Sequence, residues 1–305
     1  MANSVEPLVQ HLHARPPQVE PKRVRKLLRR ALEHGPMQDG PIAETAQLLA
    51  ERLEEARITP ERILLLGSRC HTLQNRIAQL WPKAHVTTLT LEPGWAAALR
   101  PARKKLWQRR SAPYLTAHPD QLPFANGTFD IVISNLTLHW SMELSKGLGE
   151  ARRVLRGNGW FHLTLPGHGN LYPLRQAMMD EDQARYGRSY SRMPEPLDIQ
   201  TLGDRLVRAG FTLPVSDREG FMFELPNLPT LLEMMAELGS GNPYGERPPG
   251  LGGRGYLQAV ESRLRQQQGA GPDAPLQLPM ELLFAAAWKA ADPGGNNLAL
   301  PKQEA

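Results

Sequence analysis

The residues best suited to chemistry lie in a short turn that follows an apolar run. Residues 62–67 read RILLLG, as a strand buried on both faces of a sheet would, and a helical pattern begins at Thr72. A strand, a turn with glycine and a helix N-terminus form a common nucleotide site, because the first amides of the helix face the ligand. Here the turn carries Arg69 and His71 where such turns usually have glycine. The turn is therefore either a cofactor site or an ordinary connection that binds nothing.

The elements around this turn alternate between strand and helix. Apolar runs predict strands at 62–67, 85–92, 129–135 and 160–166. Helical patterns lie between them at 72–81, 95–107 and 142–156. Alternation with short connections predicts an α/β fold with a mostly parallel, doubly wound sheet. In such a sheet the ligand lies beyond the carboxyl ends of the strands, near the switch in strand order.

The rest of the chain divides by composition and pattern. We predict a disordered tail at 1–20, helices at 21–58, a Rossmann-like core at 59–168, a helical cap with part of the core at 169–275, a final edge strand at 276–290 and a disordered tail at 291–305. The cap follows from the loose helical pattern after Pro166.

Composition excludes several classes of protein. Hydrophobic residues make up 41% of the chain, but no run of about 18 apolar residues predicts a membrane span. The first residues have no apolar signal core. Cys70 is the single cysteine, so no internal disulfide is possible, and we expect it to be a small buried residue in a cytoplasmic protein. The sequence has no metal-ligand spacing.

The charge is uneven along the chain. The formal net charge is +5, and basic residues cluster in KRVRKLLRR (22–30) and RPARKKLWQRR (100–110). No nucleic-acid-binding module accompanies them. The clusters are two solvated helix faces, or they bind an acidic protein partner, which we favour over nucleic acid.

The stretch LPFANGTFDIVISNLTLHW (122–140) carries a family resemblance. It resembles class I S-adenosylmethionine (SAM) methyltransferases, and its ending resembles the malonyl-acyl-carrier-protein O-methyltransferases of biotin synthesis, the BioC family. Further similar segments are EARRVLRGNGWFHLTL (150–165), PGLGGRGYL (249–257) and LLFAAAWK (282–289). The resemblance implies a Rossmann-like sheet with an inserted helical cap, the cofactor SAM, and methyl transfer to the carboxylate of a malonyl thioester on an acyl carrier protein.

The resemblance also assigns cofactor positions. Those that this chain could still use are Gly67, Thr90, Glu92, His118, Asn135 and Leu136. The family's first acid falls on Leu65, and two of its three glycines fall on Arg69 and His71, so the loop is degenerate. The ribose-binding acid falls on Thr90, with Glu92 two residues later. Losing two charge-assisted contacts of about 1.5–3 kcal/mol each weakens binding about a hundredfold or more.

The acceptor side is less defined by the sequence. In the family, basic residues of the inserted region hold the malonyl carboxylate, which makes Arg254 the candidate within the matched segment. By position alone, Arg175, Arg188 and Arg192 are further candidates, and a surface salt bridge is the alternative for each. No catalytic residue is predicted, because the sulfonium supplies the electrophile and the protein mainly aligns the acceptor.

Three hypotheses remain open at this stage. The first is an active SAM-dependent O-methyltransferase of the biotin-synthesis type. The second is a catalytically inactive methyltransferase-like scaffold that binds an acidic protein partner. The third, which we favour least, is other chemistry on the same fold, such as the hydroxylation associated with relatives in complex I assembly.

Overall fold

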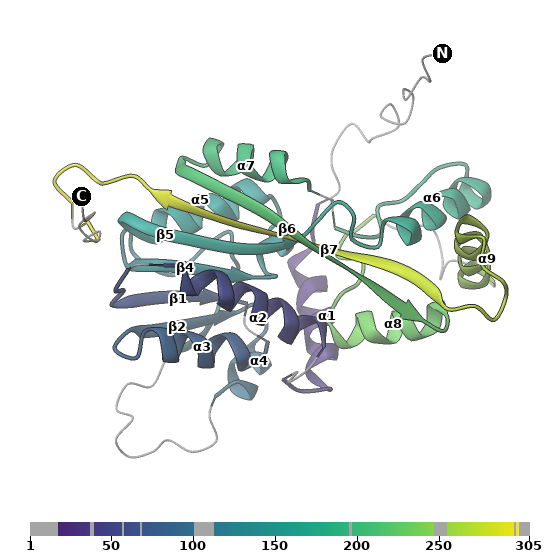
Figure 1. Cartoon of the computed structure of the whole chain (residues 1–305), viewed down its shortest axis with the longest axis horizontal. Coiled ribbons are helices and arrows are strands. Elements are labelled where there is room, and N and C mark those ends of the chain that lie inside the picture. The colour runs from purple at the N-terminus through teal and green to yellow at the C-terminus, as the bar shows by residue number, and fades with distance from the viewer. Residues whose placement is uncertain are drawn as a thin grey trace, which may run out of the picture.

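The structure is a computed structural model of the whole chain (Figure 1). It describes residues 18–36, 40–56, 58–67, 69–100, 113–194, 197–246, 255–295 and 297–298. The predicted tails lie mostly outside these residues. The described residues at the two ends contact the rest of the chain. Val19 is buried and bridges to Tyr244, and the amide of Leu298 donates to the Gly157 carbonyl at 2.8 Å.

The core of the fold is a sheet in the order β3-β2-β1-β4-β5-β7-β6. Its strands are β1 (Arg62–Leu66), β2 (His85–Thr90), β3 (Tyr114–Thr116), β4 (Phe129–Asn135), β5 (Leu155–Pro166), β6 (Phe211–Leu225) and β7 (Leu276–Lys289). The first five are parallel, and β7 runs antiparallel to both neighbours. The predicted α/β fold with a mostly parallel sheet is confirmed.

The prediction that the last strand lies at the sheet edge is wrong. Strand β7 lies between β5 and β6, and β6 is the edge strand. The burial of the two strands explains the difference. Phe284 and Ala287 of β7 are buried, whereas Leu213 and Val215 of β6 are exposed. A strand with one solvated face is suited to an edge, and one that is buried along its length is suited to the interior.

Helices cover both faces of the sheet. Residues of α2 (Pro41–Glu54) and α3 (Thr72–Leu80) form one apolar cluster with Ile63 and Leu65 of β1. Residues of α5 (Leu144–Val154) and α7 (Ile199–Arg208) form another cluster with Leu64 and Leu66. The alternation along β1 follows from the two-residue repeat of a strand, and it gives the RILLL run an apolar partner on each face.

A helical cap lies at the far end of the long β6–β7 pair (Figure 1). It consists of α6 (Tyr172–Tyr186), α8 (Leu228–Glu237) and α9 (Tyr256–Gln268), which share an apolar cluster with Leu276 and Leu278. Asp182 is fully buried in α6 and accepts hydrogen bonds from Tyr256 Oη at 2.9 Å and Arg192 Nη2 at 2.6 Å. The cap is therefore fixed by its own core and by a buried ion pair.

Helix α1 (Pro21–Leu32) lies between the sheet and the cap (Figure 1). It packs against α8 and against the short helix α4 (Pro93–Ala98), where Trp95 Nε1 donates to the Leu28 carbonyl at 2.9 Å. The helix expected at 95–107 is described only as α4, because residues 101–112 lie outside the described part. No helix among the described residues combines the length and apolar character needed to cross a membrane.

Candidate functional site

The expected cofactor position lies where the strand order reverses, between β1 and β4. Gly67 follows β1 there, and Leu136 follows β4. Both line a small cavity together with Thr90, which ends β2. The structure thus brings three of the six predicted cofactor residues to one place.

The small cavity has a volume of only about 10 Å³. That volume holds about one water molecule. Its other lining residues come from elements that pack over the ends of the strands: Leu28, Arg69, Leu91, Trp95, Thr137 and Trp140. An adenosine group does not fit into this space as the side chains stand.

Gly67 has a structural reason to be glycine in this chain. Its φ is +77°, which other residues rarely adopt, and a Cβ there would overlap the hydroxyl of Thr137. That hydroxyl donates to the Asn135 carbonyl at 2.9 Å. The glycine is explained by this contact without any ligand.

The two candidates for the ribose side are engaged with the protein. Thr90 Oγ1 donates to the Glu92 carbonyl at 3.0 Å. The buried Glu92 carboxylate accepts the Gly94 amide at 2.6 Å and Arg29 Nε at 3.3 Å. Glu92 therefore caps the start of α4, and it is not among the residues that line the small cavity.

The resemblance places His118 where the family has an acid that contacts the adenine amino group. Its Nδ1 accepts the Asp120 amide at 3.3 Å, while Nε2 is buried without a partner. Burial lowers the pKa of His118, which favours the neutral ring. In that tautomer Nε2 carries the proton and donates. It is then not an acceptor for an adenine amino group, and His118 does not line the small cavity.

Arg69, which stands where the family pattern has glycine, takes up space at this site. Its side chain is buried, and Nη1 donates to the carbonyl of Leu238 just after α8. Burial lowers the pKa of Arg69 to about 10, so the guanidinium stays charged at neutral pH. Among the described residues it has no carboxylate partner. Gly239 leaves room for it, because a Cβ there would lie 3.1 Å from Nη1.

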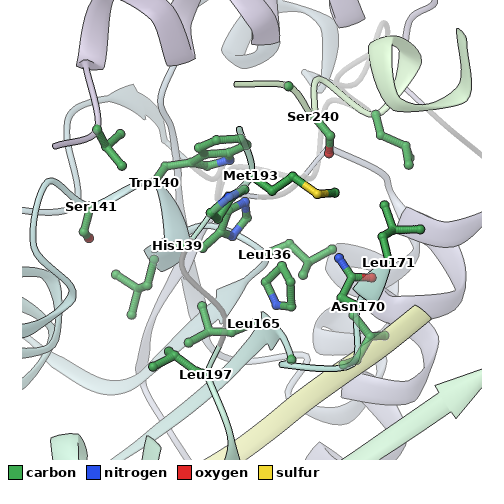
Figure 2. A pocket seen from close by; sticks show the side chains of 18 of the residues that line it. Leu136, His139, Trp140, Ser141, Leu165, Asn170, Leu171, Met193, Leu197 and Ser240 are labelled. Atoms are coloured by element: carbon green, nitrogen blue, oxygen red, sulfur yellow. The ribbon is translucent and has the colours of Figure 1, made fainter. Parts of the chain in front are cut away.

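A second, larger cavity of about 530 Å³ lies beside the first, beyond the ends of β4 and β5. Apolar side chains surround much of it, including Leu136, Leu165, Leu171 and Met193 (Figure 2). Arg69, Leu136 and Trp140 line both cavities and so lie at the boundary between them. The volume is in the range of small-molecule sites.

Polar side chains also line the large cavity, and the charged ones are Arg69, Glu143, Arg175, Arg192 and Arg205. His139 is half-buried in the wall of this cavity (Figure 2). Its Nδ1 atom is buried and has no hydrogen-bond partner among the described residues. Burial, reinforced by Arg69, lowers its pKa to about 3 and keeps the ring neutral. Arg192 also lines the cavity, but Asp182 neutralises it through two hydrogen bonds of 2.6 and 2.9 Å.

Arg175 is the candidate that the structure distinguishes from the other arginines. It lines the large cavity, burial lowers its pKa, and no carboxylate among the described residues pairs with it. Arg188 instead stacks on Tyr190, with its guanidinium carbon 4.6 Å from the ring centre. Arg254 lies outside the described residues.

No group of three His, Cys, Asp or Glu residues in the described part of the chain is arranged to hold a metal ion. The polar groups of the larger cavity can bind and orient an anion, and its apolar walls can exclude water.

Comparisons with known proteins show which family the chain belongs to. The profile of a methyltransferase domain matches residues 70–163. A malonyl-[acyl-carrier protein] O-methyltransferase of Legionella pneumophila is 32% identical, over 81% of this chain and 84% of the relative. One of Halorhodospira halophila is also 32% identical, over 80% of each chain. The chain belongs to the malonyl-[acyl-carrier protein] O-methyltransferase family.

Solved structures show the same fold. A methyltransferase-like structure from Bacillus halodurans superposes with a TM-score of 0.57 at 14% identity, covering 81% of this chain and 99% of that one. The YcgJ protein of Bacillus subtilis gives 0.53 at 11% identity, covering 82% and 99%. The predicted family resemblance and the Rossmann-like methyltransferase fold are confirmed. The family is one of transferases, and nothing in the comparisons favours the inactive scaffold.

Proposed function

We propose that this protein methylates the free carboxylate of a malonyl group that is carried as a thioester on an acyl carrier protein, with SAM as the methyl donor. Family membership supports the reaction class. The single observation in the structure that carries the proposal is Arg175, a cation without a carboxylate partner among the described residues, at an apolar cavity of about 530 Å³.

A carboxylate ligand suits this cavity for electrostatic reasons. Burying a guanidinium without a counter-ion is unfavourable, and an incoming carboxylate would supply two matched acceptors. The apolar walls would take the uncharged part of the malonyl thioester. Arg175 would hold the carboxylate oxygen that does not react, and the other oxygen would be the nucleophile.

The chemistry asks little of the protein beyond this alignment. SAM, when bound, supplies an electrophilic methyl group. A malonyl carboxylate is ionised at neutral pH, so the transfer needs no base to remove a proton. The neutral His139 is consistent with a site that positions and excludes water rather than one that moves protons.

The residues at the expected position of SAM do not leave room for it in the way that the large cavity leaves room for the acceptor. The space at Gly67, Thr90 and Leu136 is too small for an adenosine, and the carboxylate of Glu92 is engaged elsewhere. Gly67, Thr90, Leu136 and the backbone of Asn135 are the positions that we propose to contact the donor.

Helix α1 supports a carrier protein as the partner. Its exposed face carries Lys22, Arg25, Lys26, Arg29 and Arg30, and the helix contains no acidic residue. Val19, just before the helix, lines the large cavity. An acidic carrier docked on this face would therefore stand beside the acceptor cavity. A cytoplasmic location is part of the same proposal, supported by the single, buried Cys70.

Mass spectrometry of a malonyl-loaded carrier protein tests the reaction. The wild-type protein with SAM should add the mass of one methyl group, and mild alkaline hydrolysis should remove it as an ester. Arg175→Met should abolish most of this product, whereas Arg188→Met, which removes a guanidinium that stacks on Tyr190, should retain it. No mass change in the wild type at saturating SAM would refute the proposed function.

A further inference from the structure

We infer that Arg69 is a latch that closes the donor position of this chain, so that a methyl donor binds only after the guanidinium leaves the Leu238 carbonyl. The inference rests on the proposed function, because it concerns the donor half of that site. It accounts for the mismatch between a chain that belongs to a methyltransferase family and a donor cavity of about 10 Å³.

The first argument is one of space. Arg69 lies in the turn between β1 and α3, at the carboxyl end of the central strands where a doubly wound sheet binds its ligand. Its side chain crosses from this turn to the end of α8 and lines both cavities. Leu136 and Trp140 also line both cavities, so Arg69 is one of three residues at the boundary between them.

The second argument is one of charge. SAM carries a positive sulfonium, and a buried guanidinium in the adjacent position repels it strongly where water is excluded. The described acids near the site do not compensate. Glu92 pairs with Arg29, and Asp120 Oδ2 accepts the Met142 amide at 2.9 Å. Arg69 therefore opposes the donor by charge as well as by volume.

The third argument concerns why the latch can open. The carbonyl of Leu238 is a neutral acceptor, and no carboxylate among the described residues anchors the guanidinium. A hydrogen bond to a neutral group holds a charged side chain much less firmly than a bidentate ion pair. The adjoining cavity of about 530 Å³ offers space into which the side chain can move.

Calorimetric titration with S-adenosylhomocysteine tests the latch. This ligand has the adenosine and homocysteine parts of the donor but no sulfonium charge, so it reports mainly on space. We expect Arg69→Ala to bind it about tenfold or more tightly than the wild type. Arg76→Ala is the matched control, because this arginine lies on α3 in an ion pair with Glu54 and should leave the affinity unchanged. Thermal unfolding of each variant verifies that it folds.

A second variant separates the effect of the side-chain volume of Arg69 from the effect of its charge. Arg69→Met keeps much of the side-chain volume and removes the charge, so it should improve SAM binding more than it improves S-adenosylhomocysteine binding. Equal affinities of wild type and Arg69→Ala for both ligands would overturn the inference. Absence of binding to every variant at millimolar ligand would also overturn it, because the closure would then not depend on Arg69.

These outcomes are distinct from failure of the proposed function. If Arg69→Ala gains affinity but neither protein methylates the malonyl carrier, the latch stands and the acceptor assignment is wrong. If the wild type methylates the carrier at high SAM and Arg69→Ala has unchanged affinity, the reaction stands and the latch is wrong.

Discussion

The two cavities on either side of Arg69 differ in what they can accept. The cavity at the end of β1 measures about 10 Å³ and is filled by side chains of α1, α4 and the segment after β4. The cavity at the ends of β4 and β5 has a volume of about 530 Å³ and is lined by the partly buried Arg175, which has no carboxylate partner in the described part of the chain. In the function that we propose, the large cavity is the acceptor half of the site and the small cavity is the donor half, so the two halves differ in the space that they offer. The fold sets where a site lies, and a few side chains set whether it is open.

Leu28→Ala, which alters the small cavity at the end of β1, should have the largest effect of the variants considered. Leu28 is a buried residue of α1 that shares an apolar cluster with Trp95, so its truncation should lower the free energy of unfolding by about 3 kcal/mol. The same change should enlarge the small cavity and raise the affinity for S-adenosylhomocysteine. Chemical denaturation and calorimetry measure the two effects. Lost stability with no gain in affinity would show that α1 does not restrict the donor position.

Arg175→Met tests the role of the large cavity in binding the acceptor. We expect kcat/KM for the malonyl carrier to fall about fiftyfold, since a charge-assisted contact to the acceptor is lost. Arg175→Lys should recover part of the activity, because it restores the charge but not the paired geometry. Steady-state kinetics with Arg188→Met as the control measures this. An unchanged kcat/KM would place the acceptor elsewhere.

The buried histidines predict how stability depends on pH. Burial lowers the pKa of His139 to about 3 and that of His162 to about 4, so below pH 6.5 the unfolded chain binds protons that the folded chain does not. Stability should therefore fall as the pH drops from about 6.5 to 4, by up to about 1.4 kcal/mol per pH unit for each ring.

His139→Gln should reduce this slope, and His85→Gln, which changes an exposed ring, should not. Urea unfolding at a series of pH values measures both. An unchanged slope in His139→Gln would mean that the ring beside the large cavity accepts a proton in the folded state, which would alter the electrostatic account of that cavity.

Charge reversal on the outer face of α1 should have the smallest effect, which is a rise in the KM for the carrier-bound substrate. Lys26→Glu with Arg30→Glu should raise the KM for the carrier-bound substrate about fivefold, most strongly at low salt, and should leave the KM for a small malonyl thioester unchanged. Arg208→Glu, on the exposed face of α7, is the matched control. Equal effects of the two variants would argue against docking on α1.

The sequence by itself determined the sheet, the family and the position of the site. RILLL and FDIVISN are short runs whose apolar residues point to both faces, which predicts strands in the interior of the sheet with their carboxyl ends at the ligand position. The departure of Arg69 from the glycine pattern was also visible. The order of the last two strands was not, because an apolar run shows that a strand is buried but not which neighbours bury it.

The tertiary structure alone decided how Arg69, which stands in place of a glycine of the family pattern, affects the site. Leu28, Trp95 and Trp140 come from separate parts of the chain, and their contacts around Gly67 depend on how α1 and α4 dock. Likewise, Glu92 is a plausible ribose ligand in the sequence and a helix cap in the structure. Of the arginines in the cap, packing pairs Arg192 with Asp182 and leaves Arg175 facing the cavity without a carboxylate among the described residues. Local pattern fixes secondary structure, whereas the partners of a charged or bulky side chain depend on contacts between residues distant in sequence.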